Sequence, residues 1–222
     1  MSSATICTAI LAKDEAGRDL EGVLRSAFLY SAAVLVLDDN SHDETAKISR
    51  NLGCQVRGRS VLKDPAWGAE ASARAELWAW GAEVAGDGWL LIQDADMILH
   101  GDPRQLTETW DLNAWGFILR DLWSETEFRV DGPWAMGPQF ARPWLFRPDA
   151  CPEPQWSTRG LHPGHAPSNF PLVMGIAPPD TYWWEHRAYV NPERRQKKHA
   201  QYLAHADKLS QQEIAHAMSI VE

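Results

Sequence analysis

The sequence predicts an α/β protein built on a parallel sheet. Three short apolar runs, residues 5–11, 32–37 and 89–93, alternate with segments that carry apolar residues at helical spacing. This alternation is typical of parallel strands joined by helical crossovers. The third run ends in two acidic residues, Asp94 and Asp96. Hydrophobic residues make up 45% of the chain, enough for a packed core.

The first two strands are each followed by a predicted helix. Apolar residues recur at helical spacing over 20–27, after the first strand. After the second strand, Ser41 and Glu44 have the spacing of a capping box, which predicts a helix beginning at His42. Gly53 is a signal for the end of that helix.

The rest of the first half repeats this pattern. A short strand at 54–57 is followed by a loop at 61–68 and an alanine-rich helix at 69–84, before the strand that begins at Trp89. Right-handed crossovers would bring the polar residues after the strands, Lys13, Asp38 and Asp94, to one edge of the sheet.

The second half has weaker patterns. Strand candidates lie at 115–119 and 144–147, inside a long proline- and tryptophan-rich region with little periodicity. A region of this kind often forms a lid or a binding surface. Two helices are expected at the end, a basic amphipathic one at 192–209 and a last one at 211–221.

The pair Asp94 and Asp96 predicts a cation site. Side chains alternate along a strand, so both carboxylates would point to the same side at the carboxyl end, where α/β sheets bind ligands. Two carboxylates at one place repel each other unless a positive charge lies between them, and a divalent cation is the simplest candidate. The alternative is a strand that ends in a polar loop.

Composition excludes several classes of protein. The formal net charge of −9 argues against a broad grip on nucleic acid, although residues 194–198 form a local basic run. No stretch of about 18 apolar residues predicts a membrane span, and residues 1–12 lack the features of a signal peptide. Three scattered cysteines fit a reducing compartment. We therefore expect a cytoplasmic protein without a membrane partner.

Five motifs together resemble those of a known enzyme family. They are Lys13-Asp14-Glu15, the run from Asp38 to Thr45, Ala71-Ser72-Ala73-Arg74, Asp94-Ala95-Asp96, and Glu185-His186-Arg187 followed by the stretch 192–198. In this order they are similar to the motifs of family 2 glycosyltransferases, over residues 4–100 and 183–207 but poorly over 121–180. The chain departs from the family at Asp14, where Asn is usual, and at Asn40, where Gly is usual.

The resemblance implies a GT-A fold, with a mixed, mostly parallel sheet flanked by helices, an irregular acceptor region and C-terminal helices. It implies one domain over residues 1–222. Residues 1–100 would bind the nucleotide sugar, 101–190 the acceptor, and 191–222 would form the helical segment. The short chain resembles the small soluble members encoded by bacteriophages, and a phage protein would act in the host cytoplasm.

The resemblance also implies a donor site and a metal. Asp96 and His186 would hold Mn²⁺ or Mg²⁺, which neutralises the leaving diphosphate of a nucleoside-diphosphate sugar, with a UDP-sugar favoured. Asp39 would accept a hydrogen bond from the nucleobase, and Asp94 would contact the ribose or the sugar. The other expected donor-site residues are Leu11, Ala12, Lys13, Glu15, Arg74 and Gln93. Individually, Asp39, Arg74 and His186 also fit ordinary helix-start or surface roles.

Members of this family invert the sugar configuration, which requires a carboxylate as general base on the acceptor hydroxyl. The candidates are Asp131, which we favour, then Glu127, with Asp121 and Glu125 as further possibilities. The alternative is that these carboxylates are loop charges that keep the protein surface solvated. Four tryptophans of the same region fit either a sugar- or base-stacking role or a small core, namely Trp123, Trp134, Trp144 and Trp156.

The acceptor is open between a hydroxymethylated base in phage DNA and a carbohydrate. The tryptophan-rich region and the basic helix favour DNA, and the net charge of −9 opposes it. A non-catalytic module that binds sugar nucleotides is the alternative to an enzyme. A nucleotidyltransferase is disfavoured because residues 11–19 contain a single glycine, Gly17, instead of a glycine-rich phosphate loop.

Overall fold

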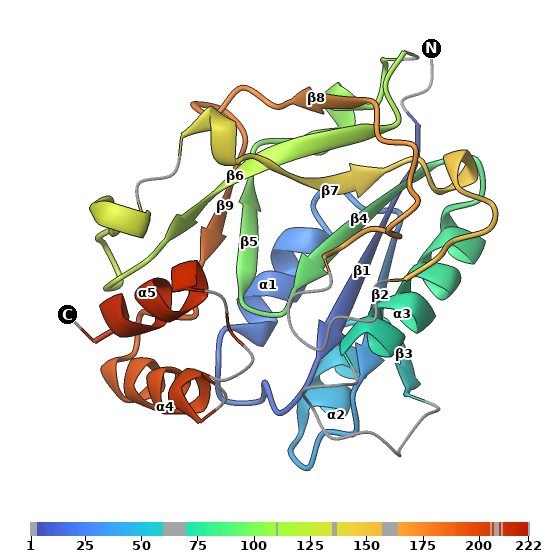
Figure 1. Cartoon of the computed structure of the whole chain (residues 1–222). Coiled ribbons are helices and arrows are strands. Elements are labelled where there is room, and N and C mark those ends of the chain that lie inside the picture. The colour runs from blue at the N-terminus through green and yellow to red at the C-terminus, as the bar shows by residue number, and fades with distance from the viewer. Residues whose placement is uncertain are drawn as a thin grey trace.

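The structure is a computed structural model that describes residues 4–59, 70–109, 111–134, 137–156, 164–204, 206, 209 and 211–221. Nine strands in this part of the chain form one curled sheet in the order β3-β2-β1-β4-β7-β6-β9-β5, with β8 paired to β6 (Figure 1). The strands are β1 (Ile6–Ala12), β2 (Ala33–Asp38), β3 (Gln55–Gly58), β4 (Trp89–Asp94), β5 (Met97–His100), β6 (Ala114–Asp121), β7 (Arg142–Phe146), β8 (Met174–Ile176) and β9 (Trp183–His186).

The first half is the predicted parallel α/β unit. Strands β3, β2, β1 and β4 run parallel, and their register places Ala12 beside Asp38 and Leu11 beside Asp94. The carboxyl ends of three strands therefore meet at one edge, as the sequence predicts. Parallel strands are buried on both faces, which explains their nearly continuous apolar sequences.

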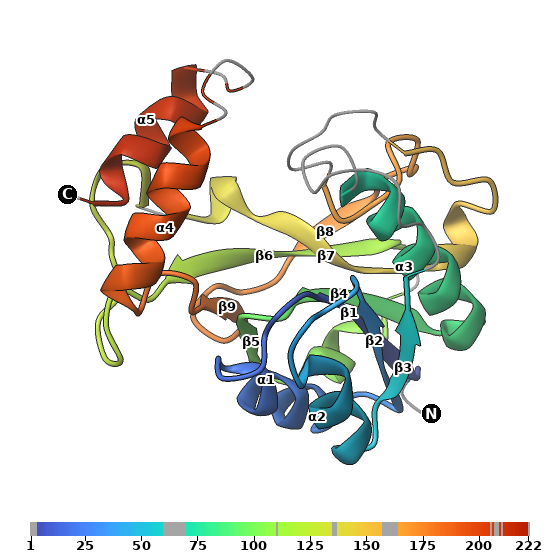
Figure 2. The same ribbon diagram turned by 90° about the horizontal axis from the view of Figure 1, so that it is seen from below.

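Helices cover both faces of this unit (Figure 2). On one face lie α1 (Leu20–Ala27) and α2 (Thr45–Asn51), and on the other α3 (Glu70–Ala85). Helix α3 lies very close to the sheet at Gly81, because a β-carbon there would come within 2.5 Å of the Leu90 side chain. This close contact accounts for the small residues of α3 that the sequence shows.

The second half turns the sheet antiparallel. Strand β7 pairs antiparallel with β4 and with β6, and β9 runs parallel to β6 and antiparallel to β5. Between them lie four short 3-10 segments, Pro103–Leu106, Gly132–Trp134, Pro138–Phe140 and Pro148–Ala150. The predicted fold class, a mixed and mostly parallel sheet flanked by helices, is confirmed.

The two last helices, α4 (Pro192–Leu203) and α5 (Gln211–Ser219), pack on each other at the end of the molecule away from α3 and β3 (Figures 1 and 2). An aromatic cluster joins them to the segment after β6. Trp134 is 1% exposed and donates from Nε1 to Ser219 Oγ at 3.0 Å. Arg129 donates to the Ser219 carbonyl, and Arg195 donates to the Trp123 carbonyl at 2.7 Å. These contacts fix α4 relative to the sheet.

Two of the four tryptophans are buried core residues. Trp134 and Trp144 are buried, and Trp156 packs on Trp78 with a ring-centroid separation of 6.1 Å. Trp123 lies between Arg129 and Arg195, each 4.5 Å from its ring. The core interpretation of this region is therefore correct for Trp134 and Trp144.

The structure corrects two helix boundaries. Helix α2 begins at Thr45 and not at His42, because the Ser41 hydroxyl accepts a hydrogen bond from the Asp14 amide and does not cap the helix. Helix α4 ends at Leu203, before the predicted end at residue 209. The predicted loop at 61–68 lies outside the described residues. No helix in the described part of the chain is long and apolar enough to cross a membrane.

Candidate functional site

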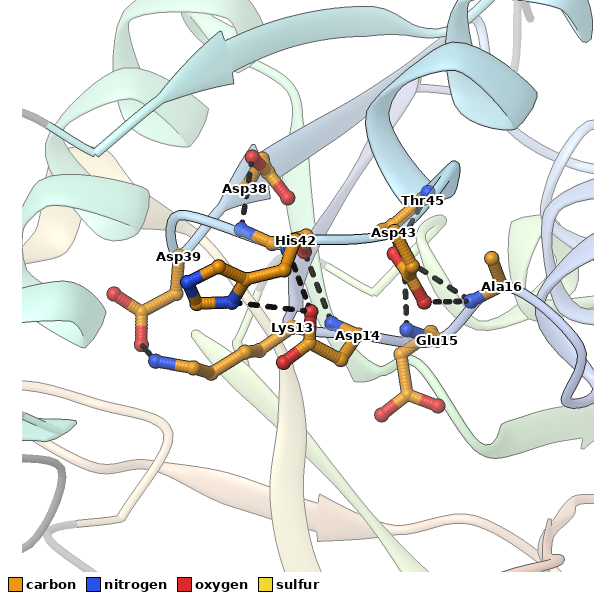
Figure 3. Close-up of polar contacts among 10 residues, drawn as sticks. Lys13, Asp14, Glu15, Ala16, Asp38, Asp39, His42, Asp43 and Thr45 are labelled. Carbon is orange, nitrogen blue, oxygen red and sulfur yellow. Dashed lines mark hydrogen bonds and ion pairs between the residues drawn. The ribbon is translucent and has the colours of Figure 1, made fainter.

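The site begins with two loops that follow β1 and β2 and hold each other in place (Figure 3). The Asp14 amide donates to Ser41 Oγ at 2.9 Å, and the His42 amide donates to Asp14 Oδ1 at 2.7 Å. The Glu15 amide donates to Thr45 Oγ1 at 2.7 Å. Asp14 and Asn40 have φ values of 51° and 57°, a region that Asn and Asp tolerate better than other residues with a side chain. The loops thus form one rigid surface.

Asp39 lies at the start of the second loop between two cations. Its carboxylate is 3.6 Å from Lys13 Nζ and 2.9 Å from Arg59 Nη1, and its amide donates to the Ala12 carbonyl at 2.8 Å. The structure brings Ala12, Lys13 and Asp39 together as the sequence predicts. Nearby Asp38 has a buried Oδ1 with no partner among the described residues.

Asp94 ends β4 and is held at both carboxylate oxygens. Arg74 of α3 donates to Oδ1 at 2.7 Å, and His165 Nε2 lies 3.5 Å from Oδ2. Arg74 is buried and also pairs with Glu70 at 3.4 Å. Burial works to raise the pKa of Asp94, but Arg74 and His165 outweigh it and hold the pKa well below its usual value. Asp94 is therefore a fixed negative charge.

Gln93 has a different environment from the one predicted for a ligand-binding residue. Its side chain is fully buried, and Nε2 donates to the Met97 carbonyl at 2.6 Å. The Tyr30 hydroxyl donates to Gln93 Oε1 at 3.4 Å. Gln93 thereby closes the tight turn that carries Asp94 and Asp96, and it acts on the site through that turn.

Asp96 faces a histidine that comes from the second half of the chain. His186 Nε2 at the end of β9 lies 3.7 Å from Asp96 Oδ2, and its Nδ1 lies 2.5 Å from Asp121 Oδ1 at the end of β6. Burial works to lower the pKa of His186, but Asp96 and Asp121 raise it to about 9. Burial also works to raise the pKa of Asp96, but the effect of His186 is larger, and the pKa of Asp96 lies below its usual value.

The residues at this place fit a divalent metal. Asp121 fixes Nδ1 of His186 as the hydrogen-bond donor, which leaves Nε2 directed at Asp96, the arrangement in which a carboxylate orients a metal-binding histidine. Asp96 and His186 would provide two ligands, and the described residues hold no group of three or more such side chains suited to a metal. The remaining positions would fall to the ligand and to water, as is usual for Mg²⁺.

Basic residues of α4 face the acidic side of the site. Arg194 Nη1 lies 4.0 Å from Asp19 Oδ2, and Lys198 Nζ lies 4.5 Å from the Tyr189 ring centroid. Burial raises the pKa of Glu15 to about 7, against the effect of Arg18 and with a further contribution from Asp96. The charges of Asp96 and of Arg194 in α4 therefore both act on Glu15.

The four base candidates have different surroundings. Asp121 is buried and bonded to His186, and Glu125 pairs with Arg187 at 2.7 Å. Asp131 is exposed and pairs with Arg129 at 2.8 Å. Glu127 and Asp131 line an open pocket with Trp123 that is distinct from the cavity beside Asp94.

Sequence reasoning missed two residues of the site, Arg59 and His165, and it named Asp121 only as a candidate base and not as the partner of His186. Arg59 follows β3 directly, and its position at the same sheet edge as Asp39 was the available signal. The pairing of Asp121 with His186 depends on the parallel alignment of β6 and β9, and β9 has no periodicity to reveal it. His165 lies in the irregular region, where no motif marks it.

Comparisons with known proteins give partial matches, and no family model matches the chain. The uncharacterized protein Rv3786c of Mycobacterium tuberculosis is 34% identical over 90 residues, which cover 39% of this chain and 22% of that protein. The uncharacterized protein Mb3815c of Mycobacterium bovis gives the same values. The match thus covers 22% of the length of these curated relatives.

Among solved structures, the chain is similar to glucosyl-3-phosphoglycerate synthase from Mycobacterium tuberculosis in complex with Mn²⁺, UDP and glucosyl-3-phosphoglycerate. The identity is 23%, the TM-score is 0.41, and the match covers 53% of this chain and 44% of that chain. The same synthase in complex with Mn²⁺ and UDP-glucose gives the same values.

Proposed function

We propose that this protein is a metal-dependent glycosyltransferase that moves a sugar from a nucleoside-diphosphate sugar, with a UDP-sugar favoured, to an acceptor hydroxyl. One observation carries the proposal. The tight turn after β4 presents Asp94 and Asp96 at the edge where β1 and β2 also end, and β9 brings His186 to the second of these carboxylates. Ligands of α/β sheets bind at such an edge.

The nucleoside would lie on the surface made by the two loops. In this proposal Asp39 accepts a hydrogen bond from the nucleobase, with its orientation fixed by Lys13 and Arg59. Leu11, Ala12 and Glu15 would complete this surface. The rigidity of the loops lowers the entropy cost of binding, because the site does not have to become ordered when the ligand arrives.

Asp96 and His186 would hold Mn²⁺ or Mg²⁺. The metal would supply a Lewis acid that neutralises the negative charge of the leaving diphosphate. Asp121 keeps the imidazole of His186 oriented, and Lys198 adds positive charge that lowers the pKa of Asp96. Asp94 and Arg74 would contact the ribose, the sugar or the adjoining phosphate from the other end of the turn.

The general base stays a proposal. An inverting transfer needs a carboxylate that takes the proton of the acceptor hydroxyl. Asp121 is assigned here to His186, so Asp131, or Glu127 after it, is the proposed base. Both line the open pocket beside Trp123, which would then admit the acceptor. The division into a donor half at 1–100, an acceptor half at 101–190 and a helical segment at 191–222 belongs to the same proposal.

For the acceptor we favour a carbohydrate over a hydroxymethylated base in DNA. The tryptophans and basic residues that suggested a DNA acceptor make contacts within the protein. Arg195 lies over Trp123 and Lys198 lies over Tyr189, while Trp134 and Trp144 are buried. The net charge of −9 also disfavours a polyanionic acceptor.

A thermal-shift panel of UDP, GDP, CDP and dTDP, each with and without Mn²⁺, tests the donor site. A ligand at about 100 times its dissociation constant should stabilise the protein by about 2.7 kcal/mol. We expect a metal-dependent shift with UDP that is lost in Asp96→Ala and in His186→Ala. Asp87→Ala, in the exposed turn at the opposite end of β4, is the control and should keep the full shift.

Release of sugar from the donor, measured with the nucleotide that binds, separates an enzyme from a binding module. An enzyme hydrolyses or transfers the sugar with turnover, whereas a module binds the donor and leaves it intact. A panel without any metal-dependent shift would contradict the donor site.

A further inference from the structure

We propose that the cavity beside Asp94 holds the transferred sugar and selects one without a net charge, with Glu70 and His165 as specificity-determining residues. This inference rests on the proposed function and adds to it the chemical class of the sugar. The two residues lie outside the motifs that suggested a donor site. They come from the first turn of α3 and from the segment before β8.

The cavity lies between α3, the end of β4, the start of β7 and the segment at 164–166. It has a volume of about 370 Å³, within the range of small-molecule sites. Its described lining residues are Glu70, Arg74, Asp94, Arg142, Pro143, Gly164, His165 and Ala166. Five of these eight residues carry a charged or polar side chain, which suits a ligand rich in hydroxyl groups.

The charges of the described lining balance. Glu70 and Asp94 contribute two carboxylates, and Arg74 and Arg142 contribute two guanidinium groups. A hydroxyl group donates to a carboxylate and accepts from a guanidinium, so a polyhydroxylated ring can use both kinds of partner. A carboxylate on the sugar would meet Glu70 and Asp94 without a surplus of positive charge to compensate it.

Arg74 has hydrogen-bond donors that the described residues leave unused. Its Nη2 donates to Asp94 and Glu70, while Nε and Nη1 are buried and have no hydrogen-bond partner among the described residues. The residue is 7% exposed, so water satisfies these donors poorly. Buried donors in native proteins are nearly always satisfied, and the hydroxyl oxygens of a bound sugar would provide the missing acceptors.

His165 forms a wall of the cavity and fixes Asp94. Its ring lies against Trp144, with the ring centroids 3.7 Å apart, and its Nε2 lies 3.5 Å from Asp94 Oδ2. Burial, and then the charge of Arg74, lower the pKa of His165, so its imidazole adds no charge to the balance. With Arg74 on the other oxygen, the free lone pairs of Asp94 point in fixed directions, which is what recognition of particular hydroxyl groups requires.

The test compares UDP-glucose with UDP-glucuronate, which differ in a CH₂OH group against a carboxylate. Isothermal titration calorimetry with Mn²⁺ gives the dissociation constants of both and of UDP alone. We expect the wild-type protein to bind UDP-glucose at least tenfold more tightly than UDP-glucuronate. Glu70→Gln removes one negative charge and should reduce this preference about tenfold. Glu83→Gln, on an exposed position of the same helix, should leave it unchanged.

His165→Phe tests the second residue. Phenylalanine keeps a ring against Trp144 and loses the contact with Asp94. We expect UDP-glucose to bind this variant no more tightly than UDP alone, while UDP itself binds as in the wild type. A circular-dichroism melting curve close to that of the wild type shows that the variant is folded. His165→Gln, which keeps a donor, should restore part of the affinity for UDP-glucose.

The outcomes separate this inference from the proposed function. Two results would overturn the sugar site while supporting the nucleotide site, provided that UDP itself binds. One is equal affinity of the wild type for UDP-glucose and UDP-glucuronate. The other is a Glu70→Gln variant with the same preference as the wild type. If no nucleoside diphosphate binds, both fall. If the nucleotide panel selects another nucleoside diphosphate, the neutral and uronate sugars of that nucleotide are compared in the same way.

Discussion

Asp94 and Asp96 are separated by one residue, yet the two ends of their turn are built differently. Asp94 is held at both oxygens by Arg74 and His165, so its charge is compensated within the protein. Among the described residues, Asp96 forms one side-chain ion pair, with His186 at 3.7 Å, and Asp121 also holds that histidine. We call these the clamped end and the open end.

The difference teaches how one short motif can serve two purposes. At the clamped end, the partners of Asp94 are in place before any ligand binds. A carboxylate held in this way can accept hydrogen bonds from particular hydroxyl groups. The open end places the carboxylates of Asp96 and Asp121 at His186, and these two raise the pKa of His186 to about 9 against the effect of burial. A site of this kind favours a cation. Breaking the clamped end should therefore cost stability, and breaking the open end should cost metal binding.

The largest effect is expected at the clamped end. Arg74→Ala removes the partner of Asp94 and should lower the free energy of unfolding by about 3 kcal/mol, the lower part of the range for a buried pair, because Asp94 is 30% exposed. Urea unfolding measures it. Arg57→Ala, whose ion pair with Glu83 lies on the surface, is the matched control and should cost about 1 kcal/mol or less. Equal losses in the two variants would contradict the clamp.

At the open end, Glu15→Gln should stabilise the protein at high pH. The pKa of Glu15 is raised from 4.5 to about 7, so its contribution to stability is complete below pH 4.5 and is lost as the pH rises through 7. Glutamine removes that loss. We expect a gain of about 2 kcal/mol at pH 8.5 and none at pH 4, by urea unfolding without metal. A gain that is the same at both pH values would show that burial of charge is not its cause.

Asp121→Asn tests the support of His186. Loss of a carboxylate that orients a metal-binding histidine weakens metal affinity by about 10–100-fold, and we expect about tenfold because Asn keeps a hydrogen-bonding group. Titration of Mn²⁺ followed by electron paramagnetic resonance measures it. Asp131→Asn, on an exposed residue paired with Arg129, should leave metal affinity unchanged. An unaltered affinity in Asp121→Asn would remove Asp121 from the metal site.

The smallest expected effect is the change of metal affinity with pH. His186 must lose a proton to bind a metal, and its pKa is raised from 6.5 to about 9. Apparent Mn²⁺ affinity should therefore rise up to about tenfold per pH unit between 7 and 9. Stability of the metal-free protein should change in the opposite sense, since the stabilisation from protonated His186 is complete below pH 6.5 and is lost as the pH rises through 9. An affinity that is flat over this range would contradict His186 as a ligand.

Prediction from sequence succeeded where local patterns decide the structure. The apolar runs of β1, β2 and β4 require burial on both faces, and their order along the chain predicted that Lys13, Asp38 and Asp94 lie at one edge. The pairing of Asp96 with His186 is present in the structure, although its role as a metal site stays a prediction. Arg74 also lies at the turn, held by Asp94.

Prediction failed where contacts between distant segments decide the structure. Strands β8 and β9 are three and four residues long, too short for a periodic pattern, and exist because β6 offers a free edge to both. His165 reaches Asp94 only through the packing of its segment on Trp144. Ser41 illustrates a further limit, because the capping-box spacing was present while its hydroxyl bonded across the loop to Asp14.

The left-handed backbone at Asp14 and Asn40 has a consequence for mutational tolerance. A residue with a β-carbon pays roughly 1 kcal/mol in this conformation unless, like Asn and Asp, its short side chain can hydrogen-bond locally. Family 2 glycosyltransferases, which the sequence motifs resemble, usually have Gly at the position of Asn40. Asn therefore belongs to the narrow set of residues that the backbone permits there. In a saturation library both positions should accept Gly, Asn and Asp and reject β-branched residues. Sequence drift in this part of the chain is thus restricted by backbone geometry as well as by ligand chemistry.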